Sequence, residues 1–323
     1  MDKTAKSILK TVGAVTGIAA ALYCFKRINS YLATRRNLLR PDEKEYYPWK
    51  FGKMAYTVTG KGRPVVLLHG IRADACGYEW HDFGWRLAAD RTVYVLDLPG
   101  FGCSDKGNAV YTNYLFADAL RAFLKDVVKE KADIITSGDS SSAALAASTI
   151  DPERIGSIIM INPEKLSAID AKTALRFRVQ RFLLDIPVIG GLIYEGFETY
   201  SAVRLRFNKD YFHEGLKAKD NHIQSFREAA HLGGDKAKFA FMNIHSGYTR
   251  NDTARLLSKA SGDGKDLYII GGEHFPEINE TIKDYQKLDR FLKFKLVPGT
   301  KGLPHMERPD YVGELCKICL RIK

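Results

Sequence analysis

The feature that most constrains the fold is a short apolar strand that turns directly into an alanine-rich helix. Residues 133–136 have the pattern of a buried strand, and residues 141–149 have the composition of a helix. The sequence SGDSSS lies between them at residues 137–142 and holds nothing larger than an aspartate. A chain reverses this tightly from strand to helix only when the residues around the turn are small. The stretch is therefore expected at the carboxyl edge of a helix-covered sheet.

Strand and helix patterns alternate from about residue 50 onward. The expected strands cover residues 54–59, 64–69, 93–98, 133–136, 155–161, 266–270 and 294–297, and the expected helices cover 114–129, 141–149, 281–288 and 309–322. Such alternation predicts an α/β fold with a doubly wound, mainly parallel sheet that is covered on both faces. The segment 165–263 breaks the alternation and predicts an inserted helical cap, which leaves core parts at 41–164 and 264–323.

Ser140 is the candidate nucleophile of the SGDSSS turn. Its neighbours two positions away, Gly138 and Ser142, are both small, as a strand–turn–helix elbow requires. The turn would lift the Ser140 hydroxyl above the sheet and aim the N–H of Ser141 at the same point. The alternative interpretation is an ordinary serine-rich helix start, which is common in proteins.

A second segment supports an acyl-transfer site. The strand at 64–69 ends in His69-Gly70-Ile71, where the N–H of Ile71 would supply a second oxyanion donor. Two converging N–H groups stabilise the negative charge that develops on a carbonyl oxygen under attack. His69 itself is expected to be structural rather than a catalytic base.

Taken in order, these segments resemble the α/β-hydrolase family. The resemblance covers about residues 50–323 and rests on HG at 69–70, Trp80, DLPGFGCSD at 97–105, GDSSS at 138–142, DPERIGSIIMINP at 151–163, YIIGGEHFPE at 268–277 and GLPHMERPDYV at 302–312. It implies the α/β-hydrolase fold with a helical cap over a serine-nucleophile site. Esterases, lipases, C–C hydrolases and epoxide hydrolases share this frame, so the substrate class does not follow from it.

The sequence departs from the family where the serine's partners belong. A serine nucleophile needs a histidine base and an acid that orients it. The positions of that acid and that histidine hold Phe275 and Gly302, and neither residue can transfer a proton. The substitutes in the sequence are His305 as base, with Glu164, Glu273 or Glu277 as the acid. His274 could also approach from the acid loop.

The N-terminal segment predicts a membrane anchor. Residues 11–25 carry no charge, and lysines and arginines flank them on both sides. We expect a single-pass anchor and a basic juxtamembrane helix within residues 1–40, with the body on the cytoplasmic side. A cleaved signal peptide and, for residues 26–40, a solvated linker helix are the alternatives.

Charge and cysteine content narrow the possible partners. The net charge is +11, but residues 1–40 carry +7 of it, so the body is nearly neutral and is not expected to bind nucleic acid. The five cysteines are scattered, and Cys316 and Cys319 fall in a helical pattern, so we expect neither metal nor cofactor.

Two functions remain open from the sequence. The first is a membrane-anchored serine hydrolase of esterase or lipase type, acting on a small or lipophilic ester. The apolar segment 186–194 of the cap would then shape its acyl pocket. The second is a catalytically degenerate hydrolase that binds a ligand or a partner without turnover.

Overall fold

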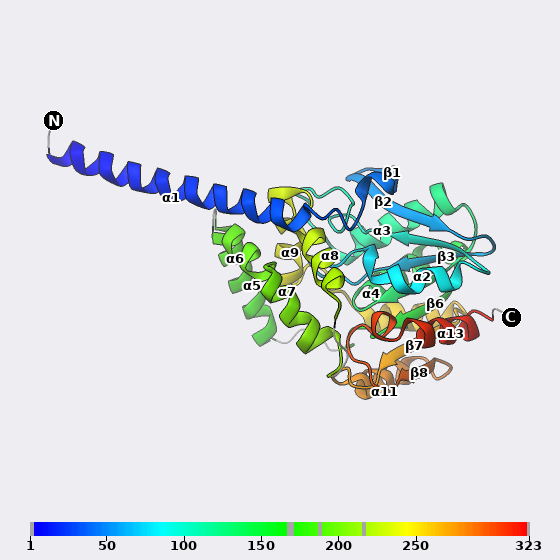
Figure 1. Ribbon diagram of the computed structural model, residues 1–323. Coiled ribbons are helices and arrows are strands. Elements are labelled where there is room, and N and C mark those ends of the chain that lie inside the picture. Colours follow the sequence, from blue (N-terminus) through cyan, green and yellow to red (C-terminus); the bar gives the residue numbers. More distant parts are fainter. Residues whose placement is uncertain (1–2, 167–170, 187–188, 215–217, 322–323) are drawn as a thin grey trace.

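The computed structural model describes residues 3–166, 171–186, 189–214 and 218–321 (Figure 1). Its centre is an eight-stranded sheet with the order β1-β2-β4-β3-β5-β6-β7-β8. The pairs β1/β2 and β2/β4 are antiparallel, and the other neighbours are parallel. The predicted α/β fold with a mainly parallel sheet is therefore confirmed.

The strands of the sheet are short; the central ones are buried, whereas β1 and β8 at the edges are largely exposed. They are β1 (Glu45–Trp49), β2 (Gly52–Thr59), β3 (Pro64–Leu68), β4 (Thr92–Leu96), β5 (Ala132–Ser137), β6 (Ile155–Ile161), β7 (Leu267–Gly272) and β8 (Lys293–Val297).

Thirteen α-helices are described. They are α1 (Lys3–Thr34), α2 (His81–Leu87), α3 (Asn113–Phe123), α4 (Ser140–Ile150), α5 (Ala171–Asp185), α6 (Ile189–Phe197), α7 (Tyr200–Arg206), α8 (Asp220–His231), α9 (Lys238–His245), α10 (Thr253–Gly262), α11 (Ile278–Leu288), α12 (Pro304–Glu307) and α13 (Pro309–Cys319).

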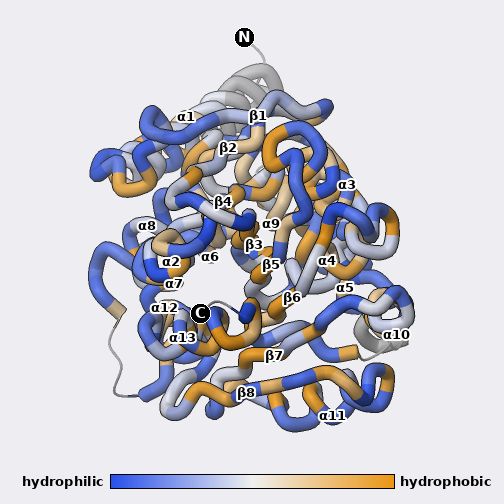
Figure 2. The backbone as a smooth tube through the Cα atoms, turned by 90° about the vertical axis from the view of Figure 1, so that its right-hand side faces the viewer, coloured by the Kyte–Doolittle hydropathy of each residue, from blue (hydrophilic) through white to orange (hydrophobic). Residues whose placement is uncertain are grey.

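Both faces of the sheet are covered by helices, as the apolar strands require. Along β3, Val66 and Leu68 face a core shared with α3, α4, α10 and α11, whereas Val65 and Leu67 face a core shared with α2 and α13. Successive side chains of a strand point to opposite faces, so an all-apolar strand such as β3 fills both cores. Hydrophobic segments accordingly concentrate along the central strands (Figure 2).

Helices α5 to α9 form a helical group beside the sheet (Figure 1). The predicted cap range 165–263 also includes α10, but Leu256, Leu257 and Ala260 of α10 pack into the sheet core with α4 and α11. Helix α10 is therefore part of the core layer, because its apolar side faces the sheet. Of the apolar segment 186–194, residues 187 and 188 lie outside the described residues.

Helix α1 projects away from the body, and only its last part contacts the cap (Figure 1). Asn29 hydrogen-bonds to Glu195, and Arg36 pairs with Asp220 of α8. Beyond the helix, the Glu228 carboxylate accepts the backbone N–H groups of residues 38 and 39, at 2.9 and 3.1 Å. The predicted lipid-facing segment 26–40 is thus held against the cap along one side.

The predicted anchor over residues 1–40 gains no support from the helices of the structure. In the part of the chain that the structure describes, no helix is both long enough and apolar enough to cross a membrane. Most of the side chains at positions 3–19 lie outside that part.

Candidate active site

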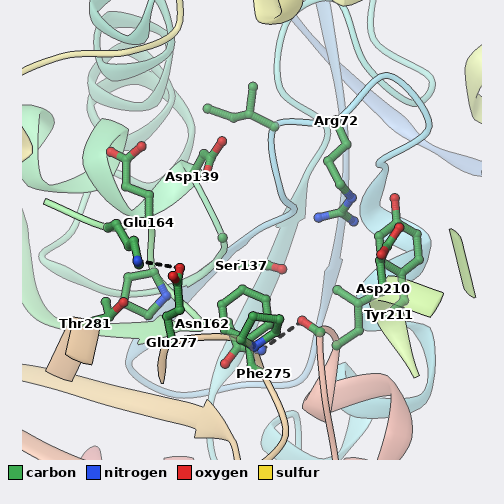
Figure 3. Close-up of a pocket in the computed structure, with 17 residues that line it drawn as sticks. Arg72, Ser137, Asp139, Asn162, Glu164, Asp210, Tyr211, Phe275, Glu277 and Thr281 are labelled. Carbon is green, nitrogen blue, oxygen red and sulfur yellow. Dashed lines mark hydrogen bonds and ion pairs between the residues drawn. The ribbon is translucent and has the colours of Figure 1, made fainter. Parts of the chain in front are cut away.

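A cavity of about 350 Å³ lies at the carboxyl ends of the parallel strands, where ligands of open α/β sheets bind. Segments that follow β3, β5, β6, β7 and β8 form most of its wall, and the cap closes it with Asp210 and Tyr211 (Figure 3). The lining residues are Ile71, Arg72, Ser137, Gly138, Asp139, Asn162, Pro163, Glu164, Lys165, Asp210, Tyr211, Phe275, Pro276, Glu277, Thr281, Gly302 and Leu303.

The turn from β5 to α4 presents Gly138 to the cavity. Gly138 has a φ of +58°, a left-handed conformation that favours glycine, and a Cβ built on it would meet no atom within 4 Å. Asp139 follows in a right-handed helical conformation, and α4 begins at Ser140. A nucleophile elbow exposes the side chain at its strained turn position. The left-handed position belongs to Gly138, two residues before the predicted Ser140, and the side chain exposed at the turn is that of Asp139.

Ser140 does not reach the cavity. Its side chain is fully buried, and its hydroxyl oxygen lies 2.9 Å from the Ser137 carbonyl oxygen and 3.3 Å from that of Leu68. The N–H of Ser141 donates to the Gly138 carbonyl at 3.1 Å, so it belongs to the start of the helix. These contacts match the alternative interpretation of a serine-rich helix start. Of the two predicted oxyanion donors, only Ile71 lines the cavity.

Phe275 and Gly302 both line the cavity, so the acid and histidine positions are where the sequence placed them. At Gly302, an added Cβ would lie 2.3 Å from the Asp210 carbonyl oxygen and 2.9 Å from Tyr211 Cα. The N–H groups of Gly302 and Leu303 donate to the Tyr211 carbonyl at 2.8 and 3.0 Å. The backbone of the cap therefore occupies the space that a side chain at position 302 would need.

His305 is buried elsewhere, against the wall formed by Trp80. Its ring stacks on Trp80 with centroids 4.3 Å apart, and its Nε2 lies 3.5 Å from the Glu79 carboxylate. Burial lowers the pKa of His305, so its ring is neutral at neutral pH. The structure does not bring His305 to the cavity or near Ser140.

The two predicted acids have different surroundings. The Glu273 carboxylate is half exposed, accepts the Gly299 N–H at 2.9 Å and does not line the cavity. Glu164 does line it, and its carboxylate accepts the Thr253 hydroxyl. Burial and the charge of Asp139 raise the pKa of Glu164 to about 7. The structure thus brings Glu164 together with Asp139, which was not among the predicted site residues (Figure 3).

Asp139 projects into the cavity, and its side chain is exposed there. Partial loss of water around the carboxyl group raises the pKa of Asp139, while the charges of Arg72 and Arg250 oppose that rise. Two interacting carboxyl groups lose their protons in separate steps, so at neutral pH one of the pair can be charged while the other is protonated. The pair can therefore both accept and donate a proton.

Arg72 is the cationic group on the other side of the cavity (Figure 3). It forms an ion pair with the fully buried Glu79, and its guanidinium lies over the Tyr211 ring, 4.8 Å from the centroid. Burial would raise the pKa of Glu79, but Arg72 and His305 overcome this effect and hold it at about 2. Glu79 is consequently an anion at all ordinary pH values, and it fixes the arginine.

His69 is structural, in agreement with its interpretation from the sequence. Its Nδ1 lies 2.8 Å from the Gly70 carbonyl oxygen, and its Nε2 accepts the Leu98 N–H at 3.0 Å. These two contacts select the tautomer with the proton on Nδ1. The ring therefore ties the loop after β3 to the loop after β4, which holds Ile71 and Arg72 at the cavity.

A family model described as the alpha/beta hydrolase family matches residues 65–314. The chain belongs to this family. A curated alpha/beta hydrolase relative, the 2-hydroxy-6-oxo-6-phenylhexa-2,4-dienoate hydrolase of Burkholderia cepacia, is 30% identical over 115 residues, which are 34% of this chain and 39% of that protein. The chain spans about a third of the length of the curated relatives that it matches. At this level the comparisons support a hydrolase-type function.

Solved alpha/beta hydrolases share the fold at low sequence identity. A serine hydrolase involved in carbazole degradation has a TM-score of 0.69 and 18% identity, and the match covers 87% of this chain and 99% of that one. A membrane phospholipase A has a TM-score of 0.68 and 16% identity, with 98% of both chains covered.

Besides Asp139, two features of the cavity were not found from the sequence. A glycine at a tight strand-to-helix turn is the usual sign of a left-handed residue, so Gly138 carried a signal for its own position in the elbow. Arg72 follows the predicted oxyanion donor Ile71 in the sequence, and this position alone does not indicate that a charged ligand binds there.

Proposed function

We propose that this alpha/beta hydrolase binds a ligand in the cavity without serine–histidine hydrolysis. The observation that carries the proposal is the identity of three cavity residues. Gly138 is at the left-handed position of the elbow, Phe275 at the acid position and Gly302 at the histidine position. None of the three has a nucleophilic or proton-transferring side chain.

The energetic consequence of three missing groups is large. Members of a catalytic triad act as a unit, and their loss costs on the order of 10⁶ in kcat in a well-studied hydrolase. The cap adds a second obstacle, because the backbone at Asp210 and Tyr211 fills the space above Gly302. The cavity itself remains open, with about 350 Å³ of volume and both polar and apolar walls.

A second candidate is hydrolysis by the carboxyl pair, which the raised pKa of Glu164 favours. Asp139, as the carboxylate, would take a proton from an attacking water. Glu164, as the acid, would give its proton to the leaving group, so water adds across the broken bond. Asp139→Asn and Glu164→Gln would then each abolish hydrolysis of p-nitrophenyl acetate, whereas Ser140→Ala would not.

We also propose that α1 attaches the chain to a membrane, with the body on the cytoplasmic side. The match to a membrane phospholipase A supports this proposal. The match covers 98% of both chains, so it must include α1, which has 32 residues. If the proposal holds, the full chain pellets with membranes after a high-salt wash and a chain without residues 1–25 does not. Pelleting of both chains would contradict it.

Labelling with a fluorophosphonate tests the main proposal directly. This reagent reacts covalently with activated serines, and mass spectrometry locates the labelled residue. We expect no labelling of the folded protein, since the Ser140 hydroxyl is buried and has no histidine partner. Labelling at Ser140 that Ser140→Ala removes would overturn the proposal and restore the serine hydrolase.

A further inference from the structure

Arg72 is positioned as a binding group by its surroundings rather than by a ligand. One side of its guanidinium pairs with Glu79, and one face lies over Tyr211. Glu79 is fully buried and permanently charged, so this ion pair holds the arginine in one orientation. About a quarter of the Arg72 side chain remains accessible.

The guanidinium keeps donors for a ligand. An arginine carries five N–H donors in a planar fork, which matches the two oxygens of a carboxylate. Among the ion pairs of the described residues, Arg72 contacts Glu79 and Asp74, and its Nε is buried without a hydrogen-bond partner. The guanidinium points toward the middle of the cavity, and Asp139 is not within ion-pair distance (Figure 3).

The wall between Arg72 and the carboxyl pair is largely apolar. Ile71, Phe275 and Leu303 contribute to it, together with Pro163 and Pro276. Phe275 stands where the family's acid would be, so the loss of the acid adds an aromatic surface to the cavity. A ligand that extends from Arg72 along this wall therefore meets one fixed cation and then an apolar surface, with the Asp139/Glu164 pair at the far end.

We propose that the cavity binds a small organic carboxylate with an apolar body, whose carboxylate oxygens accept hydrogen bonds from Arg72. This inference rests on the proposed ligand-binding function and names its ligand class. An arginine–carboxylate pair with two hydrogen bonds is stronger and more directional than a neutral contact. The apolar body would lie against Phe275 and Leu303.

Phenylacetate and its neutral analogue phenylacetamide test the inference by titration calorimetry. We expect phenylacetate to bind at least about tenfold more tightly, because hydrogen bonds from an arginine to a carboxylate are stronger than those to a neutral amide. In Arg72→Gln this preference should disappear. Arg178→Gln, which removes an exposed arginine of α5, is the matched control and should keep it.

A second variant protects the test against misfolding. Arg72→Gln leaves the buried Glu79 without its partner, whereas the double change Arg72→Gln/Glu79→Gln removes both charges and replaces them with amides. Loss of the preference in the folded double variant supports the inference. Equal affinity for the two compounds in the wild type, a preference that survives in the double variant, or no binding of either compound would overturn it.

Failure of this inference differs from failure of the proposed function. Serine-dependent fluorophosphonate labelling would overturn the proposed function even if phenylacetate bound through Arg72. Absence of labelling together with equal affinity for acid and amide would overturn only the choice of ligand class.

Discussion

Replacing Gly302 by alanine is expected to lower the free energy of unfolding by about 1–5 kcal/mol, because the new methyl group overlaps the cap backbone. The Cβ would lie 2.3 Å from the Asp210 carbonyl oxygen and 2.9 Å from Tyr211 Cα. Both are backbone atoms, so no side-chain rotation relieves the overlap. Overpacking alone costs about 1–3 kcal/mol, and the two hydrogen bonds to the Tyr211 carbonyl would weaken by up to about 1 kcal/mol each.

Urea unfolding followed by circular dichroism measures this change, with Gly262→Ala as the matched control. Gly262 ends α10, and a Cβ there would meet no atom within 4 Å, so that variant should unfold within about 0.5 kcal/mol of the wild type. If Gly302→Ala were equally stable, the cap would not fill the histidine position. The structural argument against a restored triad would then fail.

Three further predictions concern other parts of the chain. Removal of residues 1–25 should leave the urea midpoint unchanged. Removal of residues 1–40 should lower it, because residues 26–40 make the contacts with the cap. Equal midpoints of the two truncated chains would contradict this prediction. The pKa of Glu164 in the folded protein, about 7, is above its ordinary value, so the free energy of unfolding should fall as pH rises from about 4.5 to 7. The free energy of unfolding of Glu164→Gln should fall by up to about 3 kcal/mol less than that of the wild type over this range. Parallel pH profiles of the two proteins would contradict this prediction. His305→Ala should cost about 2–4 kcal/mol through the cavity left beside Trp80, and a change below about 0.5 kcal/mol in urea unfolding would show that the ring is not packed there.

Most of the fold follows from the sequence because its central strands, β3, β5, β6 and β7, are largely apolar and buried. The expected strand at 155–161 matches β6, and the other parallel strands match to within two residues. Strand β1 was not predicted, because its sequence EYYPW includes a proline and alternates weakly at the edge of the sheet. Helix α10 was assigned to the cap because an interrupted alternation cannot show where an inserted segment rejoins the core.

The sequence does not determine which residue lies at the turn of the elbow. Small residues surround Gly138, Asp139 and Ser140 alike, so the flanking pattern fits more than one register. A serine favours the interpretation as nucleophile, but the left-handed φ falls on the glycine. A shift of two residues turns the hydroxyl of Ser140 from the cavity into the helix start.

The substituted acid and histidine positions were visible in the sequence, but the fate of His305 was not. Three residues of separation in a loop are compatible with a ring at the cavity, at the surface or in the core. Its stacking on Trp80 is a contact between distant segments, which loop composition does not reveal. Arg72 was missed for the same reason, since its partners Glu79 and Tyr211 come from other elements.

The most direct test of the central claim is the hydrolysis of p-nitrophenyl butyrate by the wild type and by Ser140→Ala. Both proteins should show the same kcat/KM, no higher than that of the doubly substituted Asp139→Asn/Glu164→Gln variant. The wild type and Ser140→Ala should agree because the Ser140 hydroxyl is buried away from the cavity and Phe275 and Gly302 provide it with no acid or base. Turnover by the wild type that falls by orders of magnitude in Ser140→Ala would contradict the account.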